Sequence, residues 1–153
     1  MTQTNYLKAL TDLLVERRLM IATAESCTAG LVSGLLTDEA GSSQWIERGF
    51  VTYSNQSKQQ MLGVSGQTIQ QHGAVSQQTV REMAQGAIHH SEADVALSIS
   101  GIAGPDGGSD DKPVGTVWFA WADRDGREQQ QRKHFSGDRG AVRQQAAQFA
   151  IQG

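Results

Sequence analysis

A short run of small and polar residues, Ala24-Glu25-Ser26-Cys27-Thr28-Ala29-Gly30, carries the groups of this chain that are best suited to nucleophilic chemistry. It follows the apolar residues 19–22 and precedes residues 31–36, in which leucine and valine recur at helical spacing. A turn between a strand and a helix exposes a hydroxyl and directs backbone N–H groups at one point. This arrangement suits a nucleophile, Ser26, beside an oxyanion hole. The alternative is a plain turn in which Ser26 or Thr28 caps the helix.

Lys58 and Tyr53 follow a second predicted strand and could supply the base. A lysine in a dry pocket loses its proton more readily, because desolvation disfavours the charged form. Such an amine can take the proton of a serine hydroxyl, and Tyr53 would relay that proton or hold the amine in place. Outside a site, Lys58 would be a solvated helix lysine and Tyr53 a core aromatic residue.

Cys27 is the one cysteine of the chain and a second candidate nucleophile. A reactive thiol needs a partner that lowers its pKa, and no histidine is paired with Cys27 by its position in the sequence. We therefore prefer Ser26 as the nucleophile. A single cysteine also excludes an internal disulfide and fits a reducing compartment.

Two segments are candidates for binding a phosphate or a ribose. Gly101 and Gly104 belong to a glycine-rich loop, residues 101–108, which could bring backbone N–H groups close to an anion. Arg139 and Arg143 share one face at the start of the last predicted helix and could clamp a phosphate. The alternatives are an irregular connection for the loop and solvated side chains for the two arginines.

The side chains that commonly ligate metals form no recognisable pattern. The three aspartates near the glycine-rich loop lack the spacing of a calcium-binding EF-hand. The four histidines are scattered along the chain, without a paired ligand spacing. We therefore expect no metal site. The residues considered are Asp106, Asp110, Asp111, His72, His89, His90 and His134.

Hydrophobic spacing predicts helices and strands that alternate along most of the chain. The predicted helices are residues 5–18, residues 28–37, a short turn at 57–61, a helix capped by Ser76 and a last helix capped by Asp138. Between residues 63 and 73 we expect a short helix at most. The predicted strands are residues 20–23, 50–53, 95–100, 117–121 and 129–135. A turn signal at residues 123–126 makes the last two strands a hairpin.

This order of elements predicts a single domain, a three-layer α/β/α sandwich with a mixed, mostly parallel β-sheet. Its 153 residues are enough to bury a core without a metal or a disulfide. In such a fold, ligands bind at the carboxyl ends of the strands. Ser26, Tyr53 and Ser100 all lie at predicted strand ends, so the fold could bring their segments together.

Composition limits the partners of the chain. The formal net charge of −3 argues against a nucleic-acid groove binder, which usually carries a basic stripe. No apolar run reaches membrane-spanning length, and residues 1–4 do not resemble the start of a signal peptide. We expect a cytoplasmic domain that acts on a small molecule. A homo-oligomer is left open, because the three tryptophans suit a core or an interface equally well.

Several blocks of the chain together resemble one family, the C-terminal domain of the competence/damage-inducible protein CinA. The blocks are TAESCT at 23–28, GFVTYSN at 49–55, Lys58, SISGIAGPDGG at 98–108 and KPVGTV at 112–117. They occur in the family's order over nearly the whole chain, which makes the set far more specific than any one motif. One departure is Ala29, where the family's motif often has a second glycine.

The resemblance implies an enzyme that hydrolyses the carboxamide of nicotinamide mononucleotide to nicotinate mononucleotide and ammonia, in pyridine-nucleotide recycling. It also implies a mixed-sheet α/β/α fold and no metal or organic cofactor. The family's serine nucleophile falls on Ser26, and its tyrosine and lysine fall on Tyr53 and Lys58. Backbone N–H groups near Cys27 and Thr28 would hold the oxyanion.

Two other functions were weighed against this amidase. A catalytically inactive module of the same fold could bind or sense pyridine nucleotides, although such a module has no need for Ser26, Tyr53 and Lys58 together. A role on DNA finds no support in an acidic chain without a basic stripe.

Overall fold

The computed structural model describes residues 3–153; Met1 and Thr2, which belong to the segment judged unlike a signal peptide, lie outside the described residues. The helices are α1 (Gln3–Arg17), α2 (Leu31–Leu36), α3 (Asn55–Leu62), α4 (Gly66–His72), α5 (Gln77–His89) and α6 (Arg139–Gln152), with a short 3-10 turn at Ser42–Gln44. The strands are β1 (Ile21–Glu25), β2 (Ile46–Val51), β3 (Val95–Gly101), β4 (Thr116–Asp123) and β5 (Glu128–His134). None of the described helices is both long enough and apolar enough to cross a membrane.

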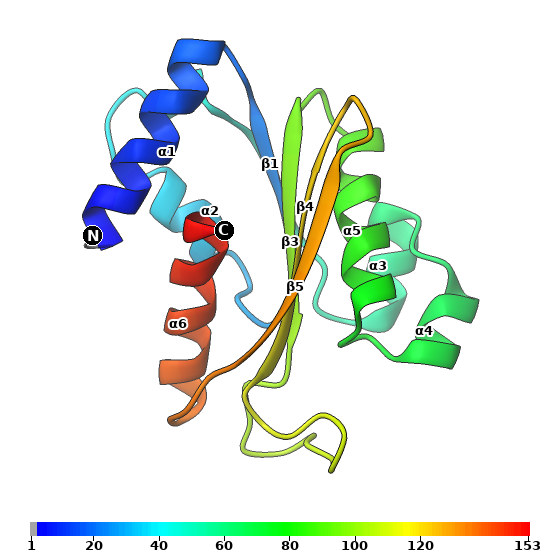
Figure 1. Ribbon diagram of the computed structural model, residues 1–153. Coiled ribbons are helices and arrows are strands. Elements are labelled where there is room, and N and C mark those ends of the chain that lie inside the picture. The colour runs from blue at the N-terminus through cyan, green and yellow to red at the C-terminus, as the bar shows by residue number, and fades with distance from the viewer. Residues whose placement is uncertain (1–2) are drawn as a thin grey trace.

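One five-stranded sheet, in the order β2-β1-β3-β4-β5, forms the middle layer. The helices α1, α2 and α6 cover one face of the sheet, and α3, α4 and α5 cover the other (Figure 1). The expected α/β/α sandwich with a mixed sheet is confirmed. β2, β1 and β3 pair in parallel, whereas β4 is antiparallel to both β3 and β5. Four of the five strands thus run in one direction. The parallel pairing is confined to β2, β1 and β3, and Ser26 directly follows β1.

Side chains of different size line the two faces of the sheet, because successive residues of a strand point to opposite sides. Leu97, Ile99 and Phe119 belong to the core under α1, α2 and α6. The opposite face carries alanine at several positions, including Ala24 and Ala96, and packs against α5. The small side chains on this face let α5 lie close to the sheet. This close packing also sets the position of α3, which contacts α5.

The second strand is misplaced by the sequence prediction. We expected residues 50–53, whereas β2 spans Ile46–Val51 and ends before Tyr53. Its first residues include Glu47, Arg48 and Gly49, which do not alternate in the manner of a half-buried strand. β2 is an edge strand with partly exposed side chains, so burial selects its composition only weakly. Consequently Tyr53 lies in the connection to α3 and not in the sheet.

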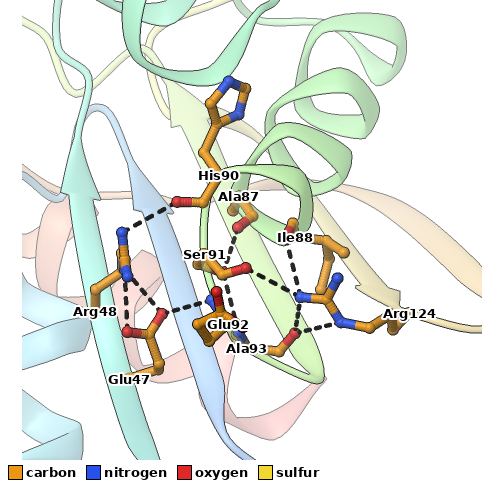
Figure 2. Close-up of polar contacts among 9 residues, drawn as sticks. All are labelled: Glu47, Arg48, Ala87, Ile88, His90, Ser91, Glu92, Ala93 and Arg124. Carbon is orange, nitrogen blue, oxygen red and sulfur yellow. Dashed lines mark hydrogen bonds and ion pairs between the residues drawn. The ribbon is translucent and has the colours of Figure 1, made fainter.

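At the end of the sheet opposite Ser26, Arg124 links the β4–β5 hairpin to the end of α5 (Figure 2). Arg124, from the β4–β5 hairpin, donates hydrogen bonds to the carbonyl groups of Ile88, Ser91 and Ala93 at the end of α5. A cation at a helix C-terminus satisfies carbonyl groups that have no partner within the helix. This contact fixes α5 at that end. At its other end the predicted cap is confirmed, because the Ser76 side chain accepts a hydrogen bond from the N–H of Thr79.

The crossing of α3 and α5 predicts opposite effects for two glycine-to-alanine substitutions. A Cβ at Gly86 in α5 would overlap the Leu62 carbonyl oxygen of α3, whereas a Cβ at Gly34 in α2 meets nothing within 4 Å. We expect Gly86→Ala to lower the free energy of unfolding by about 1–3 kcal/mol. The matched control Gly34→Ala should raise it by about 0.5–1 kcal/mol, because alanine favours a helix. Urea unfolding measures both; a change of the same sign in the two variants contradicts the close α3–α5 crossing.

Candidate active site

Lys58 enters the candidate site from α3. The Ser54 side chain caps this helix by accepting a hydrogen bond from the N–H of Ser57 at 3.0 Å. The cap starts α3 soon after β2 ends, and Lys58 follows one turn later. The residue Lys58 is only 1% exposed to solvent. The helix therefore directs a lysine amine into the protein at the carboxyl end of the parallel strands.

Three oxygen atoms surround the Lys58 amine. Nζ lies 3.0 Å from Oγ of Ser26, 2.9 Å from the carbonyl oxygen of Thr52 and 3.0 Å from the carbonyl oxygen of Tyr53. Within residues 3–153, no carboxylate forms an ion pair with this amine. A neutral amine can donate its two N–H groups to the carbonyls and present its lone pair to the serine hydroxyl. This geometry is what a general base for Ser26 requires.

The burial of Lys58 also prepares the amine for that role. Burial lowers the pKa of Lys58 to about 8, because exclusion of water disfavours the charged ammonium; the nearby Cys27 acts in the opposite direction and less strongly. A large fraction of the amine is then neutral in mildly alkaline solution. An ordinary exposed lysine would be almost fully protonated there.

Ser26 directly follows β1. Its backbone N–H donates to the carbonyl of Ile99 at 3.0 Å, which continues the β1–β3 pairing by one residue. Its Oγ faces the Lys58 amine and lies 3.4 Å from the carbonyl oxygen of Tyr53. Although 32 positions separate Ser26 from Lys58 in the chain, the parallel pairing of β1 with β2 brings the two together. The structure thus places the expected serine and lysine side by side.

Tyr53 contributes its backbone and its side chain to different places. Its carbonyl accepts from the Lys58 amine, as described above, whereas its phenol hydroxyl lies 2.9 Å from Nη2 of Arg139. The residue is 57% exposed, so it is not a core aromatic. Its hydroxyl is not hydrogen bonded to Ser26 or Lys58 in the described structure. Of the two roles considered, this arrangement fits holding the amine, and it does so through the main chain.

The turn after Ser26 offers two free donors. No other described residue accepts a hydrogen bond from the N–H groups of Cys27 and Thr28. In contrast, the carbonyl of Ser26 accepts from the N–H of Ala29 at 3.1 Å, and the carbonyl of Thr28 accepts from the N–H of Leu31 at 2.9 Å. The turn therefore satisfies its acceptors and leaves these donors for a ligand. This is the pattern expected beside a developing oxyanion.

Glu25 is a residue of this site that the sequence analysis did not single out. Its side chain is fully buried, and its carboxylate accepts from Oγ1 of Thr28 at 2.7 Å and from the N–H groups of Val32 and Ser33 at 2.9 and 3.0 Å. Oγ of Ser33 adds a further donor at 2.9 Å. The carboxylate thus caps α2 and holds Thr28. An acidic residue at the end of a buried strand, directly before the Ser26 turn, is the signal that could have identified it.

The start of α2 differs from the sequence prediction, and neither Ser26 nor Thr28 is its N-cap. The helix begins at Leu31, and the N-cap Gly30 has no side chain to cap it. Ala29 and Gly30 have φ values of 46° and 101°, in the left-handed region. Such backbone turns the chain sharply but costs an alanine roughly 1–2 kcal/mol. The alanine that departs from the family motif is therefore at a position where glycine would be favoured.

Cys27 is a poor nucleophile in this environment. The side chain is buried, and burial raises the pKa of the Cys27 thiol to about 11. Its own backbone N–H and the charges of Arg143 and Lys58 oppose this rise, but less strongly. The thiol is therefore protonated at neutral pH, and the reactive form is the thiolate. The geometry favours Ser26 over its neighbour.

The two arginines of α6 occupy different places around the site. Nε of Arg143 donates to the carbonyl of Cys27 at 2.9 Å, and its Nη2 lies 3.5 Å from the carbonyl of Thr28. Arg139 donates from Nη1 to the carbonyl of Gly104 at 2.9 Å and from Nη2 to the Tyr53 hydroxyl. Arg143 thus supports the nucleophile turn. Arg139 links the glycine-rich loop to Tyr53, and a phosphate clamp by the two together stays a prediction.

The glycine-rich loop needs its glycines for packing as well as for conformation. A Cβ at Gly101 would meet Cγ2 of Val117 at 2.6 Å, and one at Gly104 would meet Cγ1 of Val114 at 2.5 Å. Gly104 also has a φ of 87°. These contacts place the loop against the start of β4. Phosphate binding by the loop stays a prediction.

Two further features of the described residues bear on where chemistry could occur. Among the described residues, no cluster of three histidine, cysteine or acidic side chains could hold a metal ion. A cavity of about 360 Å³ is lined by residues of α1, β4 and the end of α6. The cavity reaches Ile21 and Val95, the first residues of β1 and β3. It therefore lies at the amino ends of these strands, whereas Ser26 lies at the carboxyl end of β1.

Comparison with known proteins gives consistent matches. The family model of the CinA C-terminal domain matches residues 3–153. The chain is 61% identical over 132 residues to nicotinamide-nucleotide amidohydrolase PncC of Enterobacter agglomerans, covering 86% of this chain and 80% of that protein. It is 60% identical over 139 residues to the protein of the same name from Escherichia coli K12, covering 91% and 84%.

Solved structures of similar proteins share the fold. The competence/damage inducible protein CihA of Agrobacterium tumefaciens has a TM-score of 0.92 and 43% sequence identity, over 97% of this chain and 90% of that one. The competence damage-inducible protein A of Klebsiella pneumoniae has a TM-score of 0.93 at 36% identity, over 99% and 93%.

The buried carboxylate of Glu25 predicts a stability effect. Glu25→Gln replaces one acceptor oxygen with an amide N–H₂ that faces backbone donors, so we expect a loss of about 2–4 kcal/mol in the free energy of unfolding. Glu82→Gln is the matched control: its carboxylate also accepts from a backbone N–H and a threonine hydroxyl, but it is partly exposed. We expect the control to lose less than about 1 kcal/mol. Equal losses in urea unfolding contradict a special role for Glu25.

Proposed function

The chain belongs to the CinA C-terminal domain family, and on this basis we propose that it is an amidase that converts nicotinamide mononucleotide to nicotinate mononucleotide and ammonia. The names of its relatives at 60% and 61% identity support this substrate class. The observation that carries the chemistry is the 3.0 Å contact between Oγ of Ser26 and the buried amine of Lys58. An amide is a weak electrophile with a poor leaving group, so its hydrolysis needs an activated nucleophile.

The first half of the proposed reaction forms an acyl-enzyme. The neutral Lys58 amine removes the hydroxyl proton of Ser26, and Oγ attacks the carboxamide carbon. The oxygen of the tetrahedral intermediate accepts hydrogen bonds from the N–H groups of Cys27 and Thr28. The Lys58 ammonium then gives its proton to the departing nitrogen, which leaves as ammonia. The C–N bond breaks, and the nicotinoyl group stays on Ser26 as an ester.

The second half returns the enzyme to its starting state. Lys58 is neutral again after ammonia leaves, so it can remove a proton from an incoming water. The water attacks the ester carbon, the same two N–H groups stabilise the oxyanion, and Ser26 recovers its proton from Lys58. The carbonyls of Thr52 and Tyr53 keep the amine aimed at Ser26 in both halves. One base thus serves attack and departure without a second titrating group.

The substrate proposal also explains why the phosphate site is expected near α6. Arg139 lies beside Tyr53 and the glycine-rich loop, and its guanidinium can bind a phosphate through two nitrogens. Both guanidinium groups already bind carbonyls, but Arg139 is exposed, whereas Arg143 is partly buried against the turn. We therefore assign the phosphate contact to Arg139 and the loop that contains Gly104.

Removal of the nucleophile tests the proposed activity. Purified protein should release ammonia from nicotinamide mononucleotide, and Ser26→Ala should lower kcat by at least about a thousandfold while the protein stays folded. The replacement is smaller and leaves the Lys58 contacts with both carbonyls intact. Cys27→Ala is the matched control and should keep substantial activity. A Ser26→Ala enzyme with near-normal turnover contradicts the assignment. Absence of turnover in the wild type, together with saturable nucleotide binding, favours the sensor module.

The lowered pKa of Lys58 predicts the pH dependence. The base must be neutral, and its neutral fraction grows as pH rises through the pKa, so kcat/KM should increase with pH and reach half of its plateau near pH 8. Lys58→Met should lose about 10²–10⁴-fold in activity and lose this limb of the profile. The measurement is the initial rate of ammonia release between about pH 6 and 10. This range extends about two pH units on either side of the Lys58 pKa. A profile that is flat across this range contradicts Lys58 as the base.

A further inference from the structure

The side chain of Tyr53 has a position that the proposed reaction does not use. The contact of Tyr53 with Lys58 and Ser26 is made by its carbonyl oxygen, which any residue at this position would supply. The phenol ring is exposed, and its hydroxyl is turned toward Nη2 of Arg139, 2.9 Å away. An exposed aromatic ring next to a nucleophile therefore needs a different explanation.

The ring lies where the substrate must be. The carbonyl of Tyr53 is 3.4 Å from Oγ of Ser26, so the reacting carboxamide would lie within a few ångströms of this residue. At its far end the ring is held by Arg139, which also binds the carbonyl of Gly104 across the site. Tyr53 thus spans the distance from the nucleophile to the glycine-rich loop. Among the described side chains, it is the exposed aromatic residue beside Ser26.

The substrate class has a property that such a ring can recognise. In an oxidised nicotinamide nucleotide the ring nitrogen bears the ribose and a positive charge. The face of an aromatic ring attracts a cation, and tyrosine is one of the better residues for this contact. The dihydro form of the same nucleotide has a neutral ring of nearly the same size. A tyrosine ring that attracts the cation would therefore bind the oxidised nucleotide more tightly than the dihydro form, although the two share the ribose, phosphate and carboxamide.

We propose that the Tyr53 ring is the specificity-determining surface for the cationic pyridinium, so that the enzyme binds oxidised nicotinamide mononucleotide in preference to its dihydro form. This inference rests on the proposed function for the substrate class. The role belongs to the ring face, and the hydroxyl serves to fix the ring through Arg139. Tyr53 is then needed for binding and not for transfer of the Ser26 proton.

Calorimetry on a Ser26→Ala background tests the proposal, because ligands then bind without turnover. The two probes are nicotinamide mononucleotide and its 1,4-dihydro form. Tyr53→Leu should weaken binding of the oxidised probe about 5- to 30-fold and leave binding of the dihydro probe within about 2-fold. Tyr53→Phe and Tyr53→Trp should hold the oxidised probe within about 3-fold of the tyrosine protein. Val15→Ala, an exposed apolar residue of α1, is the control and should change neither affinity.

Two results would overturn the proposal. Equal weakening of both probes in Tyr53→Leu would show that the ring only packs against the ligand. A Tyr53→Phe protein as weak as Tyr53→Leu would assign the role to the hydroxyl. A second measurement separates recognition from proton relay: with Ser26 present, the pH at half-maximal kcat/KM should be the same in Tyr53→Leu and wild type. A displaced limb in Tyr53→Leu would also overturn the proposal.

The proposed function and this inference can fail separately. The amidase is removed if the wild-type protein releases no ammonia from the oxidised probe. The comparison of the two probes still decides the role of the ring in that case, because it measures binding alone. Conversely, ammonia release with equal affinity for both probes keeps the amidase and removes charge recognition by Tyr53.

Discussion

The buried amine of Lys58 is the constraint on which the rest of the site depends. An amine without water or a carboxylate partner needs acceptors of its own, and the protein supplies them from the segment that leaves β2. The N–H of Thr52 still pairs with the carbonyl of Glu25 in β1, but the carbonyls of Thr52 and Tyr53 face the amine and accept from it. The Ser26 hydroxyl is the third group around the amine, where it can donate to the nitrogen lone pair. The need to satisfy one buried group thus places the Lys58 amine beside the Ser26 hydroxyl.

The turn that carries Ser26 is held from two sides by opposite charges. The Glu25 carboxylate binds donors of Thr28 and the first turn of α2, and the Arg143 guanidinium binds the carbonyl of Cys27. The carboxylate thus takes up hydrogen-bond donors of the turn and of α2, and the guanidinium takes up a carbonyl acceptor of the turn. The N–H groups of Cys27 and Thr28, which directly follow Ser26 in the chain, have no acceptor in another described residue. A rigid turn with free donors is the pre-organisation that acyl transfer requires, because such donors need not reorganise during the reaction.

The sequence predicted the central strands and α5 well, because buried strands and an amphipathic helix have strong hydrophobic patterns. It misplaced β2, whose edge position removes that pattern. The pairing of Ser26 with Lys58 was expected from the motifs, but the distance between them depends on parallel pairing of strands that are far apart in the chain. Glu25 was not singled out because its partners, two backbone N–H groups and the hydroxyls of Thr28 and Ser33, form no recognisable motif. For Tyr53, sequence alone could not separate a contact of the carbonyl from one of the hydroxyl.

In the proposed reaction, the Lys58 amine is neutral in mildly alkaline solution because it is buried against Ser26 and two carbonyls. The most direct measurement is an NMR titration of the lysine side-chain nitrogens in the substrate-free protein, with the Lys58 signal assigned by its absence in Lys58→Arg. We expect a pKa of about 8 for Lys58, as the proposed reaction requires. A Lys58 pKa above about 10, the usual range of a solvated lysine, would contradict it.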